Sequence, residues 1–153
     1  MKFISFNHDN SEKFGIIENN LITDLTGKID GASSLKELIK IKKIKEAKEY
    51  AKSNPGSIKP DQIEYSPLIP NPGKIICVGL NYSEHVKETN RTVEENPVIF
   101  HRFPESQTAH MQAIQRPTVS ESLDFEGEMA VVMDEGGKPV SYTHLTLPTR
   151  RGG

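Results

Sequence analysis

Asp124, Glu126 and Glu128 recur at alternate positions in a stretch that leads directly into the apolar residues 129–133. Alternate side chains of a β-strand share one face, so the pattern predicts a strand on which Glu126 and Glu128 project roughly 6.5 Å apart. Two carboxylates at that separation can bind one divalent cation. The alternative is the solvated face of a half-buried strand, and the spacing by itself leaves both interpretations open.

A candidate general base follows residues 74–79, an apolar run typical of a strand that is buried on both faces. Ser83 can cap a short helix after this run, and His85 and Glu88 then lie one turn apart on the same side of it. A carboxylate in that position can orient the imidazole and stabilise its protonated form. The alternative is a surface helix that carries an incidental His–Glu pair.

A candidate carboxylate-binding residue follows the next predicted strand, residues 97–100. Arg102 lies just past the end of this strand, after His101, and a guanidinium group matches a carboxylate in geometry. A surface arginine is the alternative. Gln107 and His110 follow in a polar loop, and composition alone assigns them no role.

The elements that must position these residues begin with three short strands, predicted at residues 2–6, 14–17 and 21–24 from β-branched and aromatic side chains. Asparagine-rich turns separate them, and His8 in the first turn is expected to be exposed. Ser34 and Glu37 form a capping box, and apolar residues at helical spacing predict one helix from there to about Lys52. Five prolines between residues 55 and 73 predict an extended connector.

Composition places the chain among ordinary globular proteins. It has 153 residues, of which 35% are hydrophobic and 26% charged, with a net charge of −2. That charge predicts no attraction to nucleic acid or to an anionic membrane surface, and no apolar run is long enough to span a bilayer. Cys77 is the single cysteine, and its apolar neighbours predict a buried, inert thiol. These features favour a cytoplasmic location.

The C-terminal residues 140–149 read as the translation of a common transposon-end sequencing adapter, so we expect residues 140–153 to be a non-natural tail that takes no part in the fold. We expect natural sequence to end near Pro139. The predicted organisation is therefore a small N-terminal domain with its linker at 1–66, a partial catalytic domain at 67–139, and the tail.

Three motifs in this order resemble the fumarylacetoacetate hydrolase family. They are residues 74–85 (KIICVGLNYSEH), 97–104 (PVIFHRFP) and 124–132 (DFEGEMAVV). Each motif is weak alone, whereas the ordered set is specific to the family. The resemblance covers roughly residues 70–133, and residues 2–24 look like the small domain that precedes the catalytic domain in many members.

The resemblance implies an α+β fold that is mainly β: a small N-terminal domain followed by an incomplete mixed β-sandwich roll. It implies a divalent cation, usually Mg²⁺ and sometimes Mn²⁺ or Ca²⁺, and a homodimer of the full-length protein. Glu126 and Glu128 match the two glutamates of the family's metal motif, and His85 and Glu88 match its catalytic pair. Arg102 falls where many relatives have a basic residue that contacts substrate.

Two departures from the family pattern limit what the resemblance implies. Gln107 and His110 match a substrate loop that in one subgroup reads Ser-Gln-x-Gly-His-Gly, but Ala109 and Met111 replace its two glycines. Because glycine permits backbone conformations that other residues resist, the resemblance does not extend to the loop's shape or to its substrate preference. The family's third metal carboxylate lies on a later strand, which this chain lacks.

We therefore expect the full-length protein to be a metal-dependent hydrolase that cleaves a C–C bond in acylpyruvate-like or β-diketo acids. The alternatives are an isomerase or decarboxylase of 2-hydroxymuconate-type 2-oxo acids, and a family member that keeps the fold without catalysis. The 153-residue chain alone is expected to be inactive and poorly soluble, since an incomplete sandwich exposes apolar strands.

Overall fold

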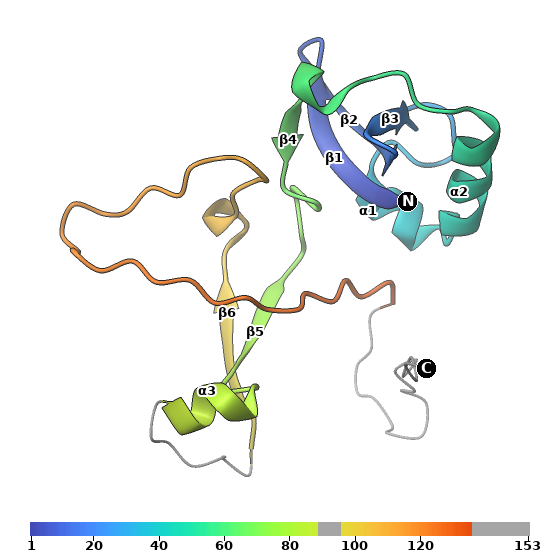
Figure 1. The fold of residues 1–153 in the computed structure, drawn as a ribbon. Coiled ribbons are helices and arrows are strands. Elements are labelled where there is room, and N and C mark those ends of the chain that lie inside the picture. The colour runs from blue at the N-terminus through green and yellow to red at the C-terminus, as the bar shows by residue number, and fades with distance from the viewer. Residues whose placement is uncertain (89–95, 136–153) are drawn as a thin grey trace. The chain divides into compact units, whose positions relative to one another are not determined.

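The computed structural model describes residues 1–88 and 96–135, except for the side chain of His85 (Figure 1). Contacts between residues divide the chain into two units, Met1–Leu123 and Asp124–Gly153. Within the described ranges no helix is both long enough and apolar enough to cross a membrane.

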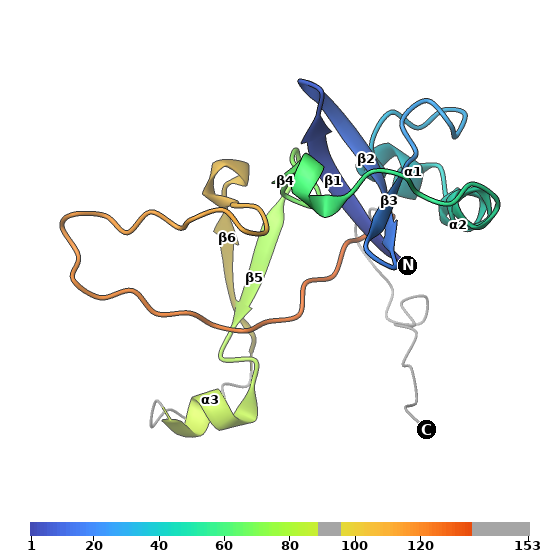
Figure 2. The ribbon, with the colours of Figure 1, turned by 45° about the horizontal axis from the view of Figure 1, so that its top comes forward.

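A four-stranded antiparallel sheet forms the N-terminal region, with strand order β3-β2-β1-β4 (Figures 1 and 2). Its first three strands are β1 (Lys2–His8), β2 (Ser11–Glu18) and β3 (Leu21–Asp24), which confirms the three predicted strands. The two hairpin turns are Asp9-Asn10 and Asn19-Asn20, and all four of these residues have φ between 50° and 62°. Positive φ at both central residues twists the turn to match the strands, which explains the asparagines.

The fourth strand, β4 (Glu64–Ser66), comes from the proline-rich segment that we predicted to be an extended connector. It pairs antiparallel with β1, with Ser5 opposite Ser66 and Phe6 opposite Tyr65. A 3₁₀ turn at Pro60–Gln62 precedes it, and the Ser5 hydroxyl donates to the Leu68 carbonyl at 2.8 Å. The connector is therefore partly built into the N-terminal sheet.

Two helices stand where one was predicted, α1 (Leu35–Lys40) and α2 (Ile44–Ser53), so the prediction of a single helix was wrong. The break is a Schellman motif, in which Lys43 N–H donates to Leu38 C=O at 3.2 Å and Lys42 N–H donates to Ile39 C=O at 2.9 Å. Lys42 has φ +60°, the left-handed conformation that this motif requires. Apolar periodicity did not reveal the break, because the break changes the direction of the chain without changing which side chains are apolar.

The predicted capping box is half correct. The Ser34 hydroxyl accepts from Glu37 N–H at 3.2 Å, as expected, but the Glu37 carboxylate accepts from Ser33 N–H at 2.7 Å and from the Ser33 hydroxyl. The carboxylate thus reaches one residue further back than a capping box requires. These hydrogen bonds from Ser33 lower the pKa of Glu37 below its ordinary value.

The hydrophobic core lies between the sheet and the two helices. The sheet contributes Phe14 and Ile16, and the helices contribute Leu35, Leu38, Ala47 and Ala51. The remaining buried members come from the loop between β3 and α1, namely Leu25, Ile29 and Ala32. Full burial of a leucine, isoleucine or phenylalanine contributes about 1.5–3 kcal/mol, so the burial of this cluster stabilises the N-terminal region.

A second, two-stranded antiparallel sheet consists of β5 (Ile75–Gly79) and β6 (Val98–Arg102), which confirms both predicted strands. The prediction that the first of them is buried on both faces was wrong, because the Ile76 side chain is 62% exposed. Cys77, expected to be buried, is half-buried. A two-stranded sheet cannot cover its own faces, so apolar strand residues stay in contact with water.

The strand predicted at residues 123–133 is absent from the described structure, in which these residues have no regular secondary structure and are exposed. A strand exists only where its backbone groups pair with a neighbour, and alternation of side chains does not supply that neighbour. The described elements are short strands with a few short helices. The chain is therefore α+β and mainly β, as predicted.

Candidate functional site

The helix α3 (Ser83–Glu88) follows β5 directly and carries the predicted catalytic pair. Val86 is 4% exposed and anchors the helix, whereas Glu88 is exposed. The backbone places His85 and Glu88 one helical turn apart, as the sequence predicted, with Ser83 as the first helical residue rather than the cap. The His85 side chain lies outside the described structure, so the contact between the pair stays a prediction.

Arg102 ends β6 opposite Ile75, the first residue of β5. Its Nε donates to the Ser106 hydroxyl at 3.2 Å, and that hydroxyl donates to the Phe103 carbonyl at 2.7 Å. The 3₁₀ turn Pro104–Ser106 therefore holds the Nε end of the guanidinium group. The guanidinium group is exposed and can donate hydrogen bonds to a carboxylate from solvent.

Gln107 is half-buried, and its side-chain nitrogen donates to two backbone carbonyls, those of Ile69 and Pro104, each at 3.3 Å. Both hydrogen bonds are long, so each is weak. Ile69 itself packs against the N-terminal core. In this structure, therefore, the predicted substrate-binding residue Gln107 ties its loop to the connector.

His110 is exposed, and its ring contacts Tyr65 of β4 edge to face, with centroids 5.0 Å apart. Its turn is closed by Gln112, whose Oε1 accepts from Ala109 N–H at 3.1 Å and whose Nε2 donates to Tyr65 C=O at 3.2 Å. Sequence reasoning gave Tyr65 and Gln112 no role. No local signal could reveal them, because 47 positions separate Gln112 from Tyr65.

The two glycine replacements in this loop have different consequences. Met111 has φ +64°, so one of the two replaced positions does require the left-handed conformation that glycine adopts freely. Ala109 is not among the positive-φ residues and is buried, at 7% exposure. The loop therefore keeps a turn that suits glycine while holding a methionine in it.

Glu126 and Glu128 belong to the second unit, where both are exposed on a segment without strand geometry. Their oxygen donors suit a hard cation such as Mg²⁺. However, the part of the chain that the structure describes contains no group of three His, Cys, Asp or Glu residues able to hold a metal ion. The residues present therefore do not fit a complete divalent-cation site.

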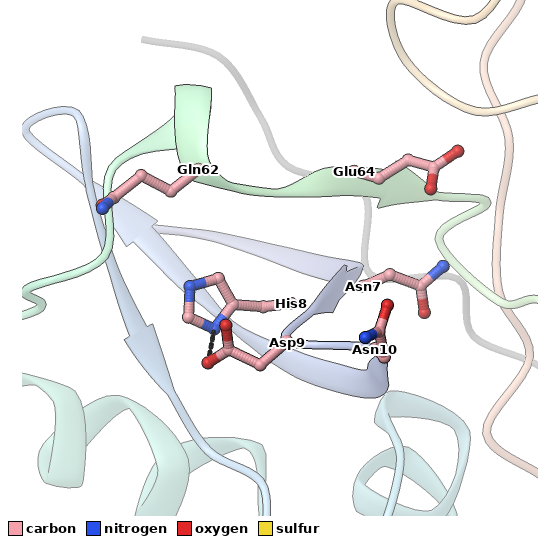
Figure 3. A pocket seen from close by; sticks show the side chains of 6 residues that line it. All are labelled: Asn7, His8, Asp9, Asn10, Gln62 and Glu64. Carbon is pink, nitrogen blue, oxygen red and sulfur yellow. Dashed lines mark ion pairs between the residues drawn. The ribbon is translucent and has the colours of Figure 1, made fainter.

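An open polar hollow of about 420 Å³ lies at the turn between β1 and β2 (Figure 3). Six residues line it: Asn7, His8, Asp9, Asn10, Gln62 and Glu64. His8 was expected to be exposed in a turn, but it ends β1 and is half-buried, with Nδ1 3.1 Å from an Asp9 carboxylate oxygen. None of the predicted site residues lines this hollow.

A half-buried ion pair joins β2 to β3. Lys13 Nζ donates to an Asp24 carboxylate oxygen at 2.9 Å, and Thr26 N–H donates to the other at 2.8 Å. Burial by itself raises the pKa of Asp24, but the hydrogen bonds from Lys13 and Thr26 outweigh burial and lower the pKa below its ordinary value. The pair therefore stabilises the N-terminal sheet and takes no part in the candidate site.

Comparison with known proteins identifies the region that carries the candidate site. The family described as "Fumarylacetoacetate (FAA) hydrolase C-terminal" matches residues 74–144, beyond the boundary predicted near residue 139. A rat protein named oxaloacetate tautomerase Fahd2a, mitochondrial, is 40% identical over 84 residues, which are 55% of this chain and 27% of the relative. A Xenopus laevis relative named oxaloacetate tautomerase fahd2, mitochondrial, is 36% identical over 94 residues, 61% of this chain and 30% of the relative.

A solved structure shares the fold. It is a crystal structure from Mycobacterium smegmatis, described as that of a candidate HpcE protein, with a TM-score of 0.56 and 21% identity over 74% of this chain and 40% of that one. The chain spans less than a third of the length of the two relatives. The matched region includes β5, α3 and β6 together with the acidic segment. Residues 74–144 match the fumarylacetoacetate hydrolase family, as the three ordered motifs predicted.

Proposed function

We propose that the whole protein is an enzyme that interconverts the enol and keto forms of a 2-oxo dicarboxylic acid of the oxaloacetate type. The observation that carries this proposal is the similarity to relatives named oxaloacetate tautomerases. Tautomerisation is an isomerisation, and this choice places the isomerase alternative ahead of the hydrolase expectation. The proposed residues are the same for both reactions.

Tautomerisation requires the transfer of one proton between two atoms of the substrate. In the direction from enol to keto, the O–H bond at C2 breaks, C3 gains a proton, and the C=C double bond becomes the C=O double bond. His85 is the proposed group that takes up and returns the proton, since a histidine titrates near neutral pH. Glu88, one turn away on α3, would orient the imidazole and stabilise its protonated form.

Substrate binding is assigned to the loop region after β5 and β6. Arg102 would pair with a substrate carboxylate, because its guanidinium is exposed while Ser106 holds its Nε. Gln107 and His110 remain proposed substrate-binding residues on the neighbouring loop. No step is assigned to a cation, because Glu126 and Glu128 do not make a complete site within the described residues. Binding of Mg²⁺, Mn²⁺ or Ca²⁺ by the whole protein stays a prediction, as do the homodimer and the cytoplasmic location.

C–C hydrolysis of an acylpyruvate is the second candidate, favoured by the description of the family that matches residues 74–144. Hydrolysis would differ in its nucleophile, since His85 would then deprotonate a water that attacks the distal carbonyl. The two candidates give different products from different substrates. One yields an isomer of unchanged mass, and the other yields two acids.

The test uses the whole protein with two substrates. One assay follows the loss of the enol absorbance of oxaloacetate, and the other follows acylpyruvate cleavage by product analysis. We expect faster ketonisation than in buffer alone, and we expect His85→Ala to lower the rate at least about 100-fold. His101→Ala serves as the matched histidine control on β6. Cleavage without ketonisation would favour the hydrolase, and full activity of the His85→Ala variant would overturn the assignment of the base.

A further inference from the structure

The turn that carries His110 is attached to the N-terminal sheet. The side-chain amide of Gln112 makes this attachment, because its oxygen bonds within the turn and its nitrogen bonds to the sheet. Its oxygen accepts from Ala109 N–H at 3.1 Å, and its nitrogen donates to the carbonyl of Tyr65 at 3.2 Å and, more weakly, to Glu64 Oε1 at 3.4 Å. The backbone N–H of Gln112 also donates to Ala109 C=O at 3.2 Å and closes the turn around His110 and Met111. One side chain therefore links the turn to β4.

The aromatic contact supports the same attachment. The rings of Tyr65 and His110 lie with centroids 5.0 Å apart and planes at 87°, the edge-to-face arrangement that aromatic pairs favour. Such a pair contributes about 0.5–1.5 kcal/mol beyond the area that it buries. Tyr65 thus contacts the turn twice, through its carbonyl and through its ring.

Tyr65, to which the turn is attached, is itself held in place by the N-terminal sheet. Tyr65 lies opposite Phe6 in the pairing of β4 with β1, and Phe6 is 1% exposed. Gln107 adds a tie from the start of the same loop to the carbonyl of Ile69, which packs on the N-terminal core. The loop 107–112 is therefore held at both ends by residues that precede β5.

We propose that Tyr65 and Gln112 are positioning residues, through which the N-terminal sheet sets the orientation of His110 and so the fit of the substrate at this loop. Neither residue contacts the reacting atoms in this proposal. The inference rests on the proposed function only in taking His110 as a substrate-binding residue. The positioning itself concerns two contacts that can be measured without any substrate.

The first experiment measures the imidazole NMR signals of His110 in the whole protein, without substrate. A tyrosine ring 5.0 Å away shifts these signals by its ring current, and Tyr65→Leu should move them toward the values of a free histidine. Tyr65→Phe keeps an aromatic ring at this position and should retain the wild-type chemical shifts of His110. Gln112→Glu keeps the acceptor for Ala109 but places an oxygen against Tyr65 C=O, so it should displace the ring as well. Gln115→Glu, on an exposed glutamine three positions away, is the matched control and should leave the signals unchanged.

The second experiment measures kcat and KM for oxaloacetate ketonisation with the same variants in the whole protein. We expect Gln112→Glu and Tyr65→Leu to raise KM about tenfold with kcat changed less than twofold, because binding is lost and the base is untouched. Unchanged His110 signals in both variants would overturn the positioning role. Shifted signals with an unchanged KM would leave the attachment standing and would show instead that His110 does not bind substrate.

Discussion

Ala109 and Gln112 close a tight turn, in which Gln112 N–H donates to Ala109 C=O at 3.2 Å. Met111 occupies the third position of this turn with φ +64°. A left-handed conformation costs a non-glycine residue about 1–2 kcal/mol, part of which is offset because glycine loses more chain entropy on folding. Met111→Gly should therefore raise the free energy of unfolding by roughly 0.5–1 kcal/mol, measured from urea denaturation.

Thr108→Gly is the control for this prediction, since Thr108 lies in the same loop without a positive φ. That variant should be neutral or should destabilise the chain by about 0.5–1 kcal/mol. Equal destabilisation by both variants would show that the Met111 backbone is not strained.

The Schellman motif that separates α1 from α2 makes a similar prediction. Lys42 holds the left-handed position, where glycine is the usual residue. Lys42→Gly should stabilise the N-terminal region by roughly 0.5–1 kcal/mol, whereas Lys40→Gly, within α1, should destabilise it by about 1 kcal/mol. Thermal denaturation followed by circular dichroism compares the two. Destabilisation by Lys42→Gly would indicate that one continuous helix forms in solution.

The ion pair of Lys13 and Asp24 predicts a pH dependence of stability. Because the folded-state pKa of Asp24 is lowered, its contribution is fully present above the unfolded-state pKa of about 3.9 and is lost as the pH falls through the lower folded-state value. Asp24→Asn should cost about 1 kcal/mol at pH 7, and its difference from wild type should shrink below about pH 4. Denaturation curves at several pH values measure this, with Asp30→Asn as the exposed control. A difference independent of pH would contradict the assignment.

The acidic segment predicts weak metal binding by this chain. Glu126 and Glu128 are exposed and belong to no group of three ligands within the described residues. Two carboxylates without further fixed ligands should bind Mg²⁺ no more tightly than about 1 mM. Isothermal titration calorimetry of the chain should therefore show no saturable site in the micromolar range. A micromolar site that Glu126→Gln abolishes would show that the chain completes a metal site after all.

The sheet of β5 and β6 predicts self-association. Ile76 is 62% exposed and Ile99 is 56% exposed, and the strand register puts Ile76 opposite His101 and Val78 opposite Ile99 on one face. Exposed apolar strands pair with other copies of the same chain. Ile76→Lys should lower the apparent mass in sedimentation at a given concentration. Leu21→Lys, on the N-terminal sheet, is the control, and an equal effect from it would point to a different contact surface.

Much of the N-terminal region could be predicted from the sequence, because the signals that specify it are local. β-Branched and aromatic residues marked three strands, and asparagines marked the two turns that need positive φ. The hydroxyl of Ser34 caps its helix through an interaction that spans three residues. Such contacts lie within a few positions and leave a readable pattern.

The candidate site was predicted from the sequence only in part. Order and spacing of motifs identified the family, and the backbone of α3 places His85 and Glu88 as expected. The prediction of a strand at residues 123–133 was wrong for the described structure, because alternating side chains indicate the faces of a strand and not the neighbour with which it pairs. The assignments of Arg102, Gln107 and His110 to substrate binding remain predictions.

By itself the sequence determined the types of residue available for chemistry, the short local elements and the family that residues 74–144 match. The helix break at Lys42 is local, but a lysine stands where glycine would usually mark it. Only the tertiary structure decided that β4 joins the N-terminal sheet and that Gln112 and Tyr65 hold the turn of His110. The physical reason is separation along the chain. A hydrogen bond between residues 47 positions apart depends on how the intervening elements pack, and no short pattern of residues encodes that packing.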